Sequence, residues 1–163
     1  MFYTRLVFAR HLIFFLFGLV FICMSISQAS AQENCSAEMN SRAVFLLIGA
    51  RKEWTSLMEH QQVFASCDDG ELGESYSDAV VHLFAQRWDQ FGMFIVIAKK
   101  HQGFKRWAIR HVDATASDES LKKIVLNVKA CSNDAEAASL CKAIQRAAAS
   151  ALAESANTAV NEK

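Results

Sequence analysis

The chain has 163 residues, of which 52% are hydrophobic and 21% are charged, and it contains five cysteines and no proline. This length suits one globular domain and excludes a multidomain machine. The formal net charge is zero. A strongly basic surface for nucleic acid and the acidic excess of a disordered chain are therefore both excluded by composition.

The first 31 residues have the pattern of a secretory signal peptide. Arg5 and Arg10 precede the apolar run Leu12–Met24, and the small-x-small sequence Ala29-Ser30-Ala31 follows it. Such a run spans about 20 Å as a helix, against the roughly 30 Å of a bilayer core, which favours a cleaved leader over a transmembrane anchor. We therefore expect a mature chain that begins at Gln32 and is exported, either periplasmic or extracellular, with no stable membrane anchor.

Cleavage would remove Cys23 and leave an even set of four cysteines. In an oxidising compartment such a set predicts disulfide bonds. Zinc is the competing use, but the spacings of 32, 64 and 10 residues include no C-x-x-C pair. A chain reversal near Gly49 would bring the first two cysteines together, and a short turn would join the last two. The predicted bridges are Cys35–Cys67 and Cys131–Cys141.

Apolar residues recur at helical spacing in six segments of the mature chain, whereas period-two alternation is weak. Ser75, Thr115 and Asn133 each stand three residues before an acidic residue, which predicts helix starts there. The segments are Val44–Ile48, Trp54–Met58, Val80–Trp88, Phe104–Val112, Leu121–Val128 and Ala137–Leu152.

The segment Phe91–Ala98 has the propensity of a buried strand, but no second strand is available to pair with it, so we expect a helix. The sequence therefore predicts an all-α protein. We expect a compact, disulfide-stabilised bundle of about five to seven short helices in a single domain over residues 32–156. The tail, residues 157–163, is expected to fray.

The most polar stretch is Asp68–Asp78, with five carboxylates in 11 residues and no lysine or arginine. Its acids do not have the alternating spacing that an EF-hand calcium loop needs before its glycine. We expect a solvated loop that is anchored by the bridge at Cys67 and by a helix cap at Ser75. Such a loop could steer a basic partner electrostatically. The residues predicted to contact the partner are Asp68, Asp69, Glu71, Glu74 and, as the aromatic contact, Tyr76.

A basic stretch runs from Lys99 to His111 and is interleaved with Phe104 and Trp107. Basic and aromatic residues together can bind single-stranded nucleic acid. Export argues against a nucleic-acid partner, and helical spacing places the two aromatic rings in the core. We therefore expect the cations to form a solvated face.

The sequence His111-Val112-Asp113 could supply an imidazole oriented by a carboxylate, as in a nucleophilic site. No G-x-S-x-G motif completes it, and the mature cysteines are expected to be oxidised. A hydrogen-bonded core histidine is the simpler interpretation. The test is whether His111 and Asp113 open into a pocket beside the acidic stretch or are sealed under Trp107 and Trp88.

The remaining histidines, His60 and His82, have no metal-ligand spacing, so we predict no metal site and no cofactor. A glycosidase-type carboxylate pair from Asp69, Glu71 and Asp89 remains an alternative, because the members of such a pair meet in space and need no fixed sequence spacing.

The favoured function is a non-catalytic exported protein that binds a protein partner, of the inhibitor or immunity type. The alternatives are a small exported hydrolase that uses His111 with nearby carboxylates, and a structural or stress protein of the cell envelope.

Overall fold

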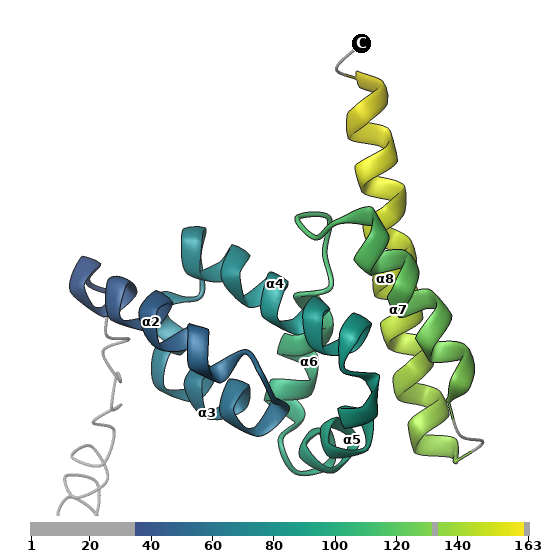
Figure 1. Ribbon diagram of the computed structural model, residues 1–163, viewed down its shortest axis with the longest axis horizontal. Coiled ribbons are helices and arrows are strands. Elements are labelled where there is room, and N and C mark those ends of the chain that lie inside the picture. Colours follow the sequence, from purple (N-terminus) through teal and green to yellow (C-terminus); the bar gives the residue numbers. More distant parts are fainter. Residues whose placement is uncertain (1–34, 132–133, 162–163) are drawn as a thin grey trace, which may run out of the picture. The chain divides into compact units, whose positions relative to one another are not determined.

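The structure is a computed structural model, and it describes residues 35–131 and 134–161. These residues form seven α-helices and three short 3-10 helices, without a strand (Figure 1). The predicted all-α, disulfide-bridged fold is confirmed. The predicted signal peptide and its cleavage site, residues 1–31, lie outside the described residues. Within the described ranges, no helix combines the length and apolar character that a membrane crossing needs.

The first two helices of the described residues are joined by the chain reversal that the sequence predicts. Helix α2 (Ala37–Ala50) begins at Ser36, whose hydroxyl accepts a hydrogen bond from the Met39 N–H at 3.1 Å. Helix α3 (Trp54–Phe64) returns alongside α2 after a three-residue turn. This reversal brings the Cα atoms of Cys35 and Cys67 to 4.8 Å, and the two cysteines form the predicted bridge.

The acidic stretch is the beginning of a helix and not a loop, which corrects the expected boundary. The short helix η1 (Ala65–Cys67) leads to α4 (Gly70–Gln86). Asp69 is the N-cap, and its side chain accepts from the Gly70 N–H at 2.7 Å. Gly70 has a φ of 50°, a conformation that glycine adopts without a steric penalty. The chain can therefore turn into α4 one and a half helical turns before Ser75, the predicted cap, which lies inside the helix.

The helix expected at Phe91–Ala98 is confirmed. After η2 (Trp88–Gln90), helices α5 (Phe91–Lys100) and α6 (Gln102–Arg110) follow in succession. The core between α3, α4 and α5 is aromatic: the ring centroids of Trp54, Phe84 and Phe94 lie 4.4–5.0 Å apart. Tilted and edge-to-face aromatic packing of this kind stabilises a core beyond the area that it buries.

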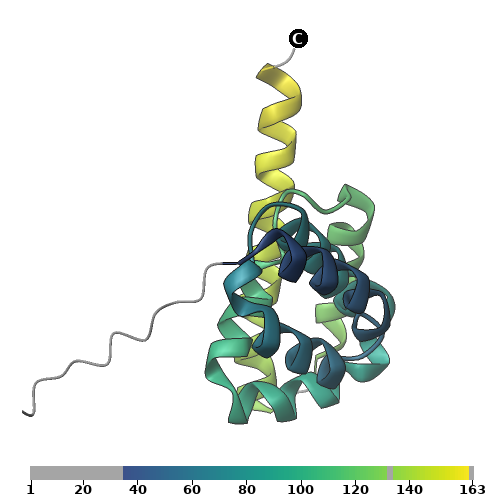
Figure 2. The ribbon, with the colours of Figure 1, turned by 90° about the vertical axis from the view of Figure 1, so that its left-hand side faces the viewer.

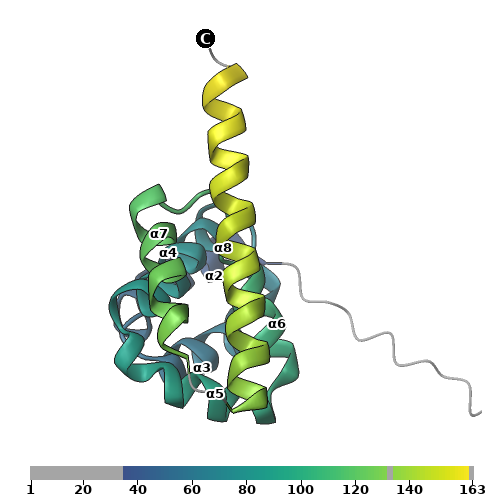
Figure 3. The ribbon, with the colours of Figure 1, turned by 90° about the vertical axis from the view of Figure 1, so that its right-hand side faces the viewer.

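The last two helices lie side by side, as Figures 2 and 3 show. Helix α7 (Asp118–Asn127) is capped by Ser117 and not by the predicted Thr115, and η3 (Val128–Ala130) ends it. Helix α8 (Ala135–Asn161) begins at Asp134, whose carboxylate accepts from two backbone N–H groups. The predicted cap, Asn133, lies outside the described residues. Helix α8 runs past the expected end at residue 156, because no glycine or proline interrupts it.

The second predicted bridge, Cys131–Cys141, joins the end of η3 to α8, with the two Cα atoms 6.6 Å apart. In the chain-entropy account, each bridge stabilises the fold by about 3–4 kcal/mol. Disulfides persist in oxidising environments and are rare in the cytosol. The two bridges therefore indicate an oxidising, exported compartment.

Candidate functional site

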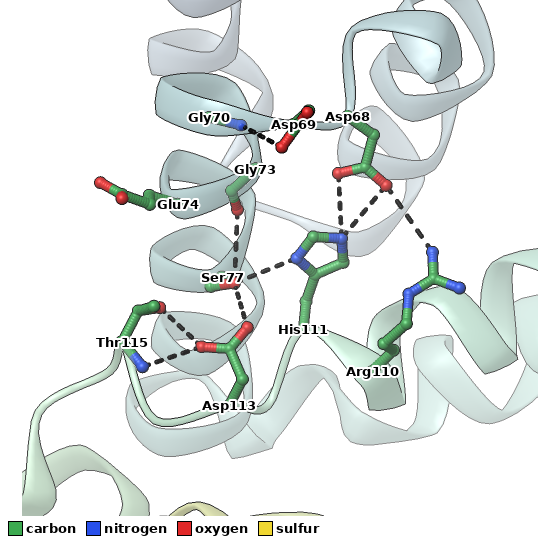
Figure 4. A pocket seen from close by; sticks show the side chains of 10 residues that line it. All are labelled: Asp68, Asp69, Gly70, Gly73, Glu74, Ser77, Arg110, His111, Asp113 and Thr115. Atoms are coloured by element: carbon green, nitrogen blue, oxygen red, sulfur yellow. Dashed lines mark hydrogen bonds and ion pairs between the residues drawn. The ribbon is translucent and has the colours of Figure 1, made fainter. Parts of the chain in front are cut away.

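The acidic stretch lines a cleft with a volume of about 530 Å³. One wall is the N-terminal half of α4, and the other is the end of α6 with the connection to α7 (Figure 4). Polar residues dominate the lining, which consists of Asp68, Asp69, Gly70, Gly73, Glu74, Ser77, Arg110, His111, Asp113 and Thr115. The fold thus brings together residues that are more than 40 positions apart in the sequence.

The base of the cleft is a chain of hydrogen-bonded side chains centred on His111, which is only 8% exposed. Its Nε2 lies 3.1 Å from Oδ1 and 3.3 Å from Oδ2 of Asp68. Its Nδ1 lies 3.0 Å from the hydroxyl of Ser77, and that hydroxyl donates to Oδ2 of Asp113 at 2.7 Å. Figure 4 shows the imidazole between Asp68 on one side and Ser77 on the other.

The Ser77 hydroxyl has one hydrogen, and its closest acceptor is the Asp113 carboxylate. The same oxygen lies within hydrogen-bond distance of Nδ1 of His111, whose Nε2 lies against the Asp68 carboxylate. The imidazole is therefore held between two carboxylates, one of them reached through Ser77.

Asp68 is the most heavily engaged acid of the cleft. Besides His111, it accepts from the indole N–H of Trp107 at 2.8 Å and forms a longer ion pair with Arg110 at 3.7 Å. Burial alone would raise the pKa of Asp68, but His111, Trp107 and Arg110 outweigh burial and hold that pKa below its usual value. Asp68 is therefore a stable anion that ties the start of α4 to α6.

Asp113 holds the opposite wall in place. Its Oδ1 accepts from both the N–H and the hydroxyl of Thr115, at 3.0 and 2.6 Å. This local turn fixes the connection between α6 and α7 against Ser77 of α4. Thr115, which the sequence predicted as a helix cap, instead orients a carboxylate of the cleft.

The predicted partner-binding residues are only partly brought together. Asp69 and Glu74 are exposed and line the cleft, whereas Asp68 lies at its base and is mostly covered. Glu71 is exposed but does not line the cleft. The prediction that Tyr76 is the aromatic contact is wrong, because its side chain is fully buried.

Tyr76 is buried because it shares a helix face with the apolar core of α4. Leu72 and Val80, four residues on either side of it, are also fully buried. Its hydroxyl lies 2.9 Å from Nδ1 of His60, whose Nε2 lies 2.9 Å from the carbonyl of Ala43. Burial raises the pKa of Tyr76 well above its usual value, and the charge of Asp68 adds to this effect.

Ser77 is the central residue of the cleft that sequence reasoning missed, because no motif surrounds it. His111 and Asp113 do line a cleft beside the acidic stretch, so the arrangement that would favour a hydrolase is present. The glycosidase-type grouping is absent: of its three acids only Asp69 lines the cleft, and Asp89 pairs with Arg87 at 3.2 Å. Phe104 and Trp107 of the basic stretch are buried, as expected.

Within the described ranges, no group of three or more potential ligands is placed to hold a metal ion. Comparisons with protein-family models, with curated proteins and with solved structures found no match.

Proposed function

We propose that this is an exported, non-catalytic binding protein whose acidic cleft holds a cationic side chain of a protein partner. The observation that carries the proposal is the charge of the cleft. Four carboxylates line it, against two groups that can be cationic, Arg110 and His111. Both cations already contact Asp68. The charges of Asp69 and Glu74, at the exposed edge of the cleft, have no cationic partner among the described residues.

The cleft is also preorganised, which lowers the entropy that a partner must overcome on binding. The disulfide bond at Cys67 lies next to Asp68, and the Asp69 cap fixes the first turn of α4. Across the cleft, the bond from Ser77 to Asp113 holds the α6–α7 connection. A guanidinium or ammonium group would enter a site whose carboxylates are already positioned.

An inhibitor or immunity-type protein of the periplasm or the cell exterior fits these properties. Such proteins meet their partners where disulfides persist, and an acidic surface speeds association with a basic partner. The attraction between exposed charges is screened within about 8–10 Å at physiological salt. Binding through this cleft should therefore weaken as salt rises.

The test uses a small neutral-ended peptide, acetyl-Gly-Arg-Gly-amide, titrated into the purified protein and followed by amide NMR. We expect shifts at Gly70, Gly73 and Thr115, and no shifts with the glutamine analogue of the peptide. Glu74→Gln should weaken binding about threefold, which is the size of one exposed ion pair.

Glu71→Gln is the matched control, since Glu71 lies one turn earlier on the same helix, is exposed, and does not line the cleft. Its affinity for the peptide should equal that of the wild type. Equal weakening by the two substitutions would show diffuse attraction rather than a site, and absence of shifts at Gly70 and Gly73 would reject the cleft.

A second candidate, a small hydrolase, is favoured by the contact between Ser77 and His111 with Asp68 behind it. These three residue types form the relay of serine hydrolases. Two features weigh against the candidate. Ser77 is only 2% exposed, and its hydrogen is directed to Asp113 rather than to the imidazole.

A fluorophosphonate probe separates the two candidates, because it modifies a serine only when that serine is an activated nucleophile. The binding function predicts no labelling of the wild type beyond that of Ser77→Ala. Stoichiometric labelling that Ser77→Ala abolishes would replace the binding function by the hydrolase.

A further inference from the structure

A second groove, with a volume of about 510 Å³, lies on the other side of the Asp68–Arg110 ion pair. It runs between the C-terminal half of α3 and helix α6. The two cavities share Asp68 and Arg110 in their linings, so the ion pair is their common border. The polar side chains of the groove differ in kind from those of the acidic cleft.

The groove is lined by donors. Arg106 and Arg110 come from α6, His101 from the residue before it, and Gln61 and Gln62 from α3. Asp68 is the one carboxylate in the lining, and it is already bonded to His111 and Trp107. Its charge is therefore largely compensated within the base of the acidic cleft.

Arg106 is the cation of the groove that no acidic group of the described residues neutralises. It is exposed, and no carboxylate among the described residues lies within ion-pair distance of it. Arg110 is 70% exposed and stands at the long distance of 3.7 Å from Asp68. Two guanidinium groups on successive turns of one helix thus face a cavity with amide donors on the opposite wall, which is a donor set suited to the oxygens of phosphate or carboxylate.

We infer that this groove is a binding site for an oxyanion, a phosphate or a carboxylate group, held by Arg106 and Arg110 with Gln61 and Gln62. The inference does not rest on the cationic ligand proposed for the acidic cleft, although the two cavities share Asp68 and Arg110. It uses the part of the basic stretch that is not needed for the core. Trp107 and Phe104 also line the groove, and their buried, stacked rings anchor α6 in the core.

The experiment is a titration with inorganic phosphate at constant ionic strength, followed by amide NMR, with sodium acetate as a second arm. We expect saturable shifts at Gln61, Gly103 and Arg106. If the site prefers phosphate, phosphate shifts these amides at a lower concentration than acetate does. If the site prefers a carboxylate, acetate acts at the lower concentration. Arg106→Ala should weaken binding at least fivefold.

Lys105→Ala is the matched control, because Lys105 is the neighbouring cation on α6 and lines a different cavity. It should leave the phosphate affinity within twofold of the wild type. Equal loss in the two variants would overturn the site in favour of diffuse charge, and so would shifts that do not saturate. Glu74→Gln should not reduce phosphate binding, so this test can fail or succeed whatever happens to the peptide in the acidic cleft.

Discussion

Two buried histidines of this protein have opposite electrostatic surroundings. His60 is 6% exposed and His111 is 8% exposed, and each has both ring nitrogens in hydrogen-bond contact. The partners of His60 are a phenol and a backbone carbonyl. His111 instead lies between the carboxylate of Asp68 and a serine that is bonded to the carboxylate of Asp113.

Because the two rings are almost equally buried, the difference between them comes from their hydrogen-bond partners. The carbonyl of Ala43 can only accept, so Nε2 of His60 carries the hydrogen and Nδ1 accepts from Tyr76. Burial lowers the pKa of His60, and the ring is a neutral part of the core. The His111 ring is a bridge between charged groups at the base of a cleft, where a ligand can reach the same network.

The largest expected effect comes from removing the anion behind His111. Asp68→Ala would leave the Trp107 indole N–H and the His111 Nε2–H buried without their acceptor. Loss of one member of a buried charged network costs several kcal/mol. We expect the free energy of unfolding to fall by about 3 kcal/mol, measured by urea denaturation.

Substitutions of two neighbouring acids give a scale for this loss of stability. Asp69→Ala removes only a helix cap and should cost about 1 kcal/mol. Glu71→Ala changes an exposed side chain and should stay within about 0.5 kcal/mol of the wild type. If Asp68→Ala cost no more than Asp69→Ala, the network around His111 would contribute nothing beyond the start of α4.

The next effect concerns the neutral histidine. Because the pKa of His60 is lower in the folded protein, the unfolded chain binds a proton first as the pH falls below about 6.5. The stability that depends on neutral His60 is complete above that pH, and it is lost as the pH falls towards the pKa of His60 in the folded protein. The slope is at most about 1.4 kcal/mol per pH unit.

His60→Gln keeps an acceptor and a donor at this position but does not titrate. Unfolding measured from pH 7.5 to 5 should therefore show a smaller loss of stability in this variant than in the wild type. Identical slopes for His60→Gln and the wild type would mean that His60 becomes protonated as easily in the fold as in the unfolded chain.

Asp68 gives a smaller effect at more acid pH. Its pKa is lowered in the fold, so its stabilising contribution is present above about pH 4 and is lost as the pH falls through the folded value. Wild-type protein should lose more of its free energy of unfolding than Asp68→Asn does between pH 4.5 and pH 2.5, as measured by urea denaturation. Equal losses of the free energy of unfolding in the two proteins over this pH range would contradict the arrangement at the base of the cleft.

The sequence predicted the parts of this structure that depend on local pattern. Helical spacing predicted six helical segments, the lack of a second strand to pair with Phe91–Ala98 predicted a helix there, and the number and spacing of cysteines predicted both bridges. The same spacing contained the signal that Tyr76 is buried, because it lies four residues from Leu72 and from Val80. The acidic character of the stretch around Tyr76 concealed that signal.

The network of the cleft could not be predicted in this way. Ser77 and His111 are separated by 34 residues, and no rule of sequence spacing relates them. Their contact depends on how α6 packs across α4, which is decided by the core and not by the polar residues themselves. The boundary error at α4 has a similar origin, because a positive φ at Gly70 is permitted by the sequence but is not required by it.

The smallest expected effect is a coupling between the two cavities that share the Asp68–Arg110 pair, and it rests on both proposed sites. A phosphate held by Arg106 and Arg110 would add negative charge beside the acidic cleft and compete with Asp68 for Arg110. Both changes favour a cation in the cleft. An interaction of about 0.4 kcal/mol between separated charges corresponds to a twofold gain in affinity for acetyl-Gly-Arg-Gly-amide. Saturating phosphate should produce this gain relative to chloride at equal ionic strength, and Arg106→Ala should abolish it. A loss of peptide affinity in phosphate would instead mean that Arg110 helps to hold the peptide, and the two cavities would then compete.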